Sequence, residues 1–150
     1  MDAQRIMSLE VVTVPPELSL QAAHQLMLDR GLRHLPVVAG QKLAGILSDR
    51  DLLLAIGGSQ GAFIYPPSSV GEVMSLAPVS AAPDASIAEL ARTMMDAKID
   101  ALPIINSRDV LLGLVTSTDL MRILSRWLPQ EPQPTLSFQI RRAADLQAHA

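Results

Sequence analysis

The sequence contains no cysteine, which excludes disulfide bonds and thiolate metal sites and is typical of proteins in a reducing compartment. Aromatic residues make up only 3% of the chain, and its net charge is −3. The chain therefore lacks both the stacking surfaces and the excess positive charge that nucleic-acid binding uses. Its three histidines have no clustered carboxylate partners at metal-ligand spacing, so we expect no metal site.

Signatures of catalysis and of membrane insertion are also missing. The sequence has no Ser–His–Asp order with a glycine elbow, and the glycines at 57–61 lack the lysine of a phosphate-binding loop. We therefore expect no catalytic residues and no enzyme activity. No basic region followed by an apolar stretch opens the chain, and glycines and prolines interrupt the uncharged run at 52–71. We expect a cytoplasmic protein that binds neither membrane nor nucleic acid.

What the sequence does contain is one unit that occurs twice. Residues 7–42 align with 74–109 without a gap, and ten of the 36 aligned pairs are identical. After one added turn residue, 45–51 aligns with 113–119. One copy alone is too small for a large core, but two copies can bury their apolar faces against each other. Crevices between such copies are natural ligand sites, so a binding module is the leading interpretation.

The order of predicted elements is the same in both copies: strand, helix, strand, strand, helix. Ser19 and Ser86 stand at helix N-cap positions before apolar stripes at helical spacing. Glu89 completes a capping box, and Gly31 is placed to end the first helix. The strands are expected at 11–14, 35–38 and 43–47 with a helix at 51–56, and at 78–80, 102–105 and 110–115 with a helix at 119–127.

These elements divide the chain into a first repeat at 1–57, a linker at 58–69, a second repeat at 70–127 and a proline-rich tail at 128–150. The stretch that joins the copies is expected to be irregular because glycine, serine and proline interrupt it. In the tail, residues 138–149 form either a terminal helix or a frayed end. As a helix, this segment would act as an arm that packs on a neighbouring subunit.

The pattern Gly-x-x-Ser/Thr-x-x-Asp occurs once per copy and is the strongest candidate for chemistry. Gly45 and Gly113 leave space inside a strand, which lets another group approach the backbone. Ser48 and Thr116 stand at a strand-to-helix junction, where unpaired N–H groups suit phosphate.

The aspartate of this pattern has two interpretations. Asp51 and Asp119 fall in the first helical turn, where a carboxylate can accept hydrogen bonds from the vicinal hydroxyls of ribose. The same spacing is that of a plain helix cap. Both copies need a cap, so duplication does not decide between the two.

The ordered repeats, with Leu-Pro-Val-Val at 35–38 and Gly-Ile-Leu-Ser-Asp-Arg-Asp at 45–51, resemble a cystathionine-β-synthase (CBS) domain pair, or Bateman module. The likeness covers about residues 1–127 and extends to stand-alone bacterial members of the acetoin-utilisation type. It implies an α/β (α+β) fold of two tandem β-α-β-β-α repeats about a pseudo-two-fold axis. It also implies assembly into a homodimer, with no obligatory cofactor and with clefts that bind AMP, ADP, ATP or S-adenosylmethionine.

In the resembled family, the aspartate of this pattern holds the ribose hydroxyls and the preceding serine or threonine contacts phosphate. The resemblance places these roles on Asp51 with Ser48, and on Asp119 with Thr116. Residues near the first strand and around the Leu-Pro pair are implied to hold the adenine. They are Thr13, Val14, Arg33, His34 and Pro36 in the first copy and Ser80, Ala81, Asp100, Ala101 and Pro103 in the second.

The two copies differ in charge at this site. The cations Arg33, His34 and Arg50 of the first copy are replaced by Asp100, Ala101 and Thr118 in the second. Because cations neutralise phosphate, we expect the first-copy site to prefer a phosphorylated ligand, unless the arginines are merely solvated surface residues. Two functional hypotheses follow: a regulatory module that senses an adenosine-containing ligand, or a ligand-free dimeric adaptor. The sequence identifies neither the ligand nor the protein partner.

Overall fold

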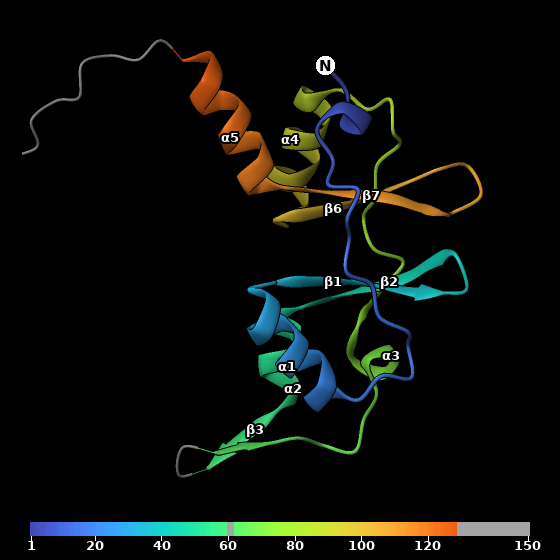
Figure 1. Cartoon of the computed structure of the whole chain (residues 1–150), viewed down its shortest axis with the longest axis vertical. Helices are drawn as coiled ribbons and strands as arrows, with labels where there is room; N and C mark the ends of the chain where they lie inside the picture. Colours follow the sequence, from blue (N-terminus) through green and yellow to red (C-terminus); the bar gives the residue numbers. More distant parts are fainter. Residues whose placement is uncertain (60–61, 129–150) are drawn as a thin grey trace, which may run out of the picture.

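The computed structural model describes residues 1–59 and 62–128. Two similar halves are stacked with their small sheets facing each other and their helices outside (Figure 1). The first half contains α1 (Leu20–Arg30), β1 (His34–Ala39), β2 (Lys42–Ser48) and α2 (Asp49–Ala55). The second half contains α4 (Ile87–Ala97), β6 (Ala101–Ile105), β7 (Leu111–Thr116) and α5 (Ser117–Trp127). This arrangement confirms the predicted α+β fold of two repeated units.

The first long helix of each half ends where the sequence predicts. The hydroxyl of Ser19 accepts a hydrogen bond from a backbone N–H of α1, and Gly31 ends this helix in the left-handed conformation with φ of 62°. Ser86 and Glu89 form the predicted capping box of α4, and Lys98 ends it with φ of 54°. These caps satisfy backbone groups that a helix leaves without partners.

Each sheet is an antiparallel hairpin that packs on its own helices. β1 pairs with β2, and β6 pairs with β7. The two cores contain Leu20, Leu35, Val37, Leu47 and Leu52 in the first half and Leu90, Leu102, Ile104 and Val115 in the second. All of these side chains are almost completely buried, and each buried leucine contributes about 2 kcal/mol to the free energy of unfolding.

The segment that begins each sequence repeat packs on the opposite half of the molecule. The short helix η1 (Ala3–Arg5) and Met7 join the core of the second half. The helix α3 (Val70–Val73) and Met74 join the core of the first half. The packed halves therefore differ from the sequence repeats by an exchange of these leading segments.

Backbone contacts confirm that the exchange is symmetric. The contact of Ser8 with Leu114 is repeated as that of Ser75 with Ile46. The contact of Asp2 with Ser86 is repeated as that of Ser69 with Ser19. In each pair of contacts, every residue occupies the position of its counterpart in the other repeat. Such reciprocity is what a pseudo-two-fold axis requires.

The exchanged segments cross the return strands at the two pattern glycines. A Cβ atom placed on Gly45 would lie 2.9 Å from Cγ of Met74, and one placed on Gly113 would lie 2.7 Å from Cγ of Met7. Both would also lie within 3 Å of the carbonyl oxygen of the residue after the methionine. The prediction that another group approaches these glycines is confirmed, and that group is the chain itself.

Some elements differ from the prediction. The strands expected at 11–14 and 78–80 are reduced to single bridging residues, Val14 beside β1 and Ala81 beside β6, because neighbouring prolines cannot donate to a longer ladder. The short β5 (Ser75–Leu76) adds to β2. The tail beyond residue 128, with its predicted helix or frayed end, lies outside the described residues.

The joining stretch, expected to be irregular, contains a hairpin of β3 (Gly57–Ser59) and β4 (Ala62–Ile64). Side chains near this hairpin hold it against α1. The hydroxyl of Tyr65 lies 2.7 Å from Nδ1 of the buried His24, and the ring of Phe63 meets the same imidazole edge-on at 4.8 Å. These aromatic contacts attach β4 and the residue after it to α1.

Two further predictions concern membranes and metals. No helix that the structure describes is long and apolar enough to cross a bilayer. Within residues 1–59 and 62–128, no three His, Cys, Asp or Glu side chains come together as metal ligands.

Candidate functional site

A cleft of about 460 Å³ lies between the two halves, and we call it the first-copy cleft. The first half contributes Arg33, His34, Ser48, Asp49, Arg50 and Asp51, which lie at the start of β1 and at the β2–α2 junction. The exchanged segment that pairs with β2 contributes residues 75–79, and the second half contributes residues 98–101. Because both halves form its walls, a ligand in this cleft would contact both at once.

At the β2–α2 junction, Ser48 and Asp51 form a reciprocal capping box. The hydroxyl of Ser48 accepts a hydrogen bond from the backbone N–H of Asp51, and Oδ2 of Asp51 accepts one from the backbone N–H of Ser48, both at 3.0 Å. The second carboxylate oxygen, Oδ1, accepts no hydrogen bond from any described residue. Capping therefore uses one oxygen of Asp51, a residue that lines the cleft, and leaves its other oxygen without a partner among the described residues.

Cationic side chains line the same cleft as this carboxylate. Arg50 is exposed, and Nε of Arg33 forms an ion pair of 3.2 Å with Oδ2 of Asp49. Burial lowers the pKa of the His34 imidazole below its usual value of 6.5, and the nearby Arg33 guanidinium lowers the pKa further. The carboxylates of Asp49 and Asp100 act in the opposite direction and only partly offset this lowering. The first-copy cleft thus combines the guanidinium groups of Arg33 and Arg50, the ammonium group of Lys98 and this imidazole with the carboxylates of Asp49, Asp51 and Asp100.

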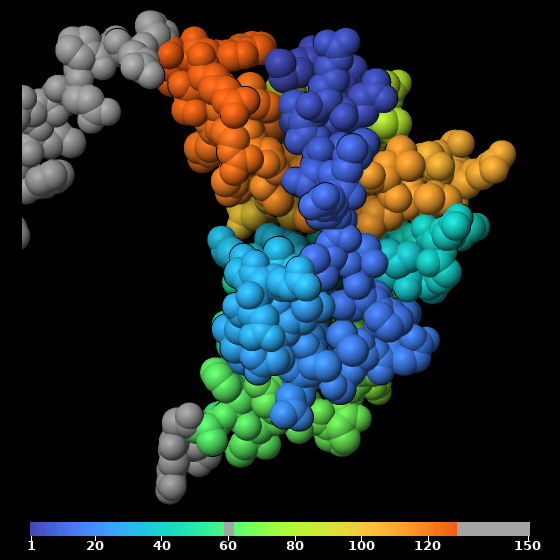
Figure 2. All heavy atoms as spheres, in the orientation of Figure 1, coloured from blue at the N-terminus to red at the C-terminus, as the bar shows by residue number. Residues whose placement is uncertain are grey.

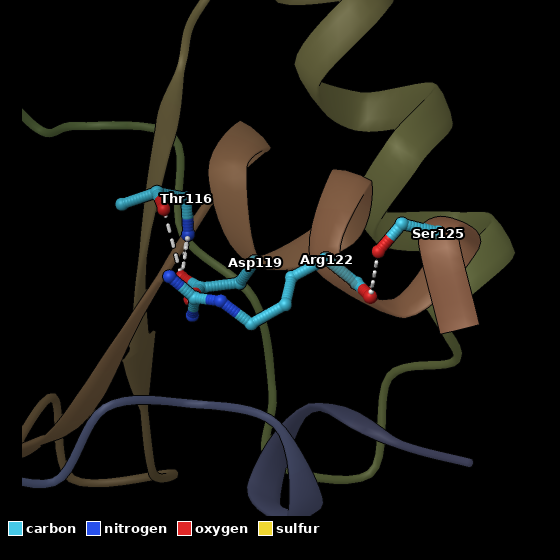
Figure 3. A network of polar contacts seen from close by, with 4 residues as sticks. All are labelled: Thr116, Asp119, Arg122 and Ser125. Atoms are coloured by element: carbon cyan, nitrogen blue, oxygen red, sulfur yellow. Dashed lines mark hydrogen bonds and ion pairs between the residues drawn. The ribbon is translucent and has the colours of Figure 1, made fainter. Parts of the chain in front are cut away.

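The equivalent junction in the second half is fully engaged (Figure 3). Oδ2 of Asp119 accepts hydrogen bonds from the backbone N–H of Thr116 at 2.9 Å and from its hydroxyl at 2.7 Å. Oδ1 accepts one from Nη1 of Arg122 at 3.0 Å. Both carboxylate oxygens of Asp119 therefore have protein partners, unlike those of Asp51.

The second junction also lacks a single shared cleft. Thr116 lines a smaller cavity of about 220 Å³ together with residues 31–34 and Asp100. Asp119 instead lines a separate cavity on the side of η1. Ser48 and Asp51 thus line one cleft in the first half, whereas their counterparts Thr116 and Asp119 line two different cavities.

The remaining candidates lie in different places. Ala101 and Asp100 line the first-copy cleft beside Asp51. The residues outside its walls are Thr13, Val14, Pro36, Ser80, Ala81 and Pro103. Val14, Pro36 and Pro103 are buried within their own halves, and Thr13 is exposed. For these residues a ligand contact stays a prediction.

Residues 75–79 and Lys98 line the cleft and were not predicted from the sequence. Residues 75–79 lie there because the segment that includes β5 pairs with β2 of the first half, whereas Lys98 lies at the end of α4 in the second half. The repeated Met-Ser-Leu sequence beside a strand glycine was the available signal, since a glycine inside a strand indicates a close backbone approach.

Comparisons with known proteins agree with this architecture. A family model described as CBS domain matches residues 3–58 and 70–126. The chain is 36% identical over 114 residues to the CBS domain-containing protein YhcV of Bacillus subtilis, covering 76% of this chain and 79% of that protein.

Larger proteins contain a similar region. The chain is 35% identical over 111 residues to inosine-5'-monophosphate dehydrogenase of Korarchaeum cryptofilum, which covers 74% of this chain and 22% of the enzyme. The chain spans less than a quarter of the length of this enzyme and of the next relatives that it matches.

Solved structures share the fold. AcuB from Vibrio cholerae is 35% identical, with a TM-score of 0.71 over 84% of this chain and 91% of that one. The cytosolic domain of the Mg²⁺ channel MgtE in complex with ATP is 26% identical, with a TM-score of 0.68 over 81% and 48%. CBSX2 of Arabidopsis thaliana in complex with AMP is 21% identical and shows the fold alone, with a TM-score of 0.74 over 83% and 96%. With both repeats matched by the family model and the exchanged two-fold architecture in place, the chain belongs to the CBS-domain family as a tandem pair.

Proposed function

We propose that this chain is a regulatory module that binds an adenosine-containing ligand in the first-copy cleft. The candidates are AMP, ADP, ATP and S-adenosylmethionine. The observation that carries the proposal is the open Oδ1 of Asp51 in the wall of a cleft that both halves form. A carboxylate oxygen in this position can accept hydrogen bonds from ribose hydroxyls, as acidic residues do in dinucleotide sites.

Two arginines of the first-copy cleft would favour a phosphorylated ligand. Arg33 and Arg50 line the same cleft, and guanidinium groups form charge-assisted hydrogen bonds with phosphate. The ATP and AMP held by the related structures of MgtE and CBSX2 support this ligand class. The hydroxyl of Ser48 offers a further polar contact at the cleft wall.

Regulation would follow from the position of the cleft. A ligand that contacts residues of both halves binds most tightly in one relative placement of the halves, and it shifts the population by that difference in affinity. A protein partner would then recognise the favoured placement. We propose that the chain has no catalytic activity of its own, forms a homodimer and functions in the cytoplasm.

The thermal unfolding midpoint with and without AMP, ADP, ATP or S-adenosylmethionine tests the proposal. A ligand that binds only the folded state raises the midpoint by mass action. We expect such a rise in the wild type, its loss in Asp51→Ala, and its retention in Asp119→Ala. The second variant is a matched control because it removes the equivalent cap from the other half.

A ligand-free adaptor is the second candidate, and one observation favours it: both aspartates take part in capping boxes. Under this alternative, Asp51→Ala lowers stability by about 1 kcal/mol and changes no ligand response. Absence of any rise in the wild type at millimolar ligand would support the adaptor and contradict the sensor.

A further inference from the structure

A pocket between η1 and α5 concentrates positive charge away from the first-copy cleft. This arginine pocket has a volume of about 350 Å³ and is lined by Arg5 from η1 and by Arg122 and Arg126 from α5. Among the described residues that line it, Asp119 is the one acidic side chain, and it is paired with Arg122. Three guanidinium groups against one carboxylate leave two positive charges uncompensated, in a chain whose net charge is −3.

These charges are not a by-product of the repeat. The counterparts of Arg5, Arg122 and Arg126 in the other repeat are Glu72, Leu54 and Gly58. The first half keeps the same core and the same capping box without any of these arginines. Folding therefore does not require positive charge at these positions.

The arrangement of the arginines carries a cost that an anion would remove. Arg122 and Arg126 are four residues apart on α5, so they share one helix face and their like charges repel each other. Asp119 neutralises only the first of them, since Arg5 and Arg126 form no ion pair within the described part of the chain. An anion bound between these groups would relieve the repulsion.

The walls of the arginine pocket suit an anion that carries an organic group. Ile6 and Ile123 supply apolar surface, and Trp127, the only tryptophan of the chain, lies at the pocket as an exposed residue. Figure 2 shows the N-terminal segment lying against α5, the two parts of the chain that form these walls. Guanidinium groups bind phosphate oxygens in a planar, bidentate geometry.

We infer that the arginine pocket binds a phosphate-bearing anion. Two sources supply this chemistry: inorganic phosphate, or an organic phosphate whose apolar part packs on Ile6, Ile123 and Trp127. The inference does not depend on a ligand at Asp51.

Calorimetric titration of pyrophosphate into the full chain at low ionic strength tests the inference, with Trp127 fluorescence as a local signal. We expect saturable binding together with a change in tryptophan emission, which reports occupation of this pocket. Arg5→Gln and Arg126→Gln should each weaken binding about tenfold, as expected for the loss of one charged hydrogen bond. Arg108→Gln is the matched control, because Arg108 is an exposed arginine of the β6–β7 turn outside the pocket.

The inference is overturned if the folded wild type shows no saturable pyrophosphate binding at millimolar concentration, or if all three arginine variants bind alike. Asp51→Ala should leave pyrophosphate binding to the arginine pocket unchanged. The experiment can therefore fail for the arginine pocket independently of whether the first-copy cleft binds an adenosine-containing ligand. Ile123→Ala distinguishes the two sources. It weakens binding of ATP relative to pyrophosphate if the pocket takes an organic phosphate, and it changes neither if the pocket takes the inorganic anion alone.

Discussion

The two halves share their fold and their helix caps, but they use the same aspartate differently. In the first half, Asp51 caps α2 with one oxygen and leaves the other open to a cleft. In the second half, Thr116 and Arg122 engage both oxygens of Asp119. Helix capping therefore accounts for an aspartate at this position in both copies. The proposed ligand contact depends instead on whether a neighbouring side chain, such as Arg122, already occupies the second carboxylate oxygen.

The largest expected effect tests whether the halves are structurally equivalent. Gly45→Ala and Gly113→Ala should each lower the free energy of unfolding by about 3 kcal/mol, because the added methyl overlaps the crossing segment. Gly58→Ala is the control, since its nearest neighbour would be 3.8 Å away. Chemical denaturation measures the differences, and a small effect at only one pattern glycine would contradict the symmetric exchange.

The next effect separates stability from binding. Asp51→Ala should cost about 1 kcal/mol and Asp119→Ala about 2 kcal/mol, because Asp119 makes more hydrogen bonds. The order should be reversed for the rise in unfolding midpoint on adding ligand: Asp51→Ala should lose this rise, and Asp119→Ala should keep it. Equal losses of ligand response in both variants would show that the halves do not differ in the proposed way.

The smallest effect belongs to His34, whose counterpart in the second half is Ala101. Its pKa is lowered in the folded protein, mainly by burial, so the unfolded chain takes up a proton more readily. Stability from this group is present above pH 6.5 and is lost as the pH falls below it. Unfolding midpoints from pH 8 to pH 5 should fall less in His34→Gln than in the wild type, and an identical fall would contradict this assignment.

Much of the fold could be predicted because local signals agree with the packing. Ser19, Gly31, Ser86 and Glu89 mark the helix ends at the positions that the structure shows. The repeat alignment also identified the Ser48–Asp51 and Thr116–Asp119 junctions, which both form capping boxes.

The exchange of leading segments could not be predicted from one sequence. A repeat alignment pairs residues 7–9 with 74–76 but does not reveal on which half each segment packs, since both halves offer an equivalent surface. The cleft walls at 75–79 were missed for that reason. The β3–β4 hairpin was missed because its order comes from Phe63 and Tyr65 packing on His24, a contact distant in sequence.

The difference between the two aspartates depends on Arg122, a residue three positions along the helix whose side chain could equally have pointed to solvent. A crystal structure of the chain with AMP would show directly which half holds the ribose. We expect the ribose hydroxyls within hydrogen-bond distance of the Asp51 carboxylate, with the Asp119–Arg122 pair intact. AMP bound at Asp119 with the first-copy cleft empty would contradict it.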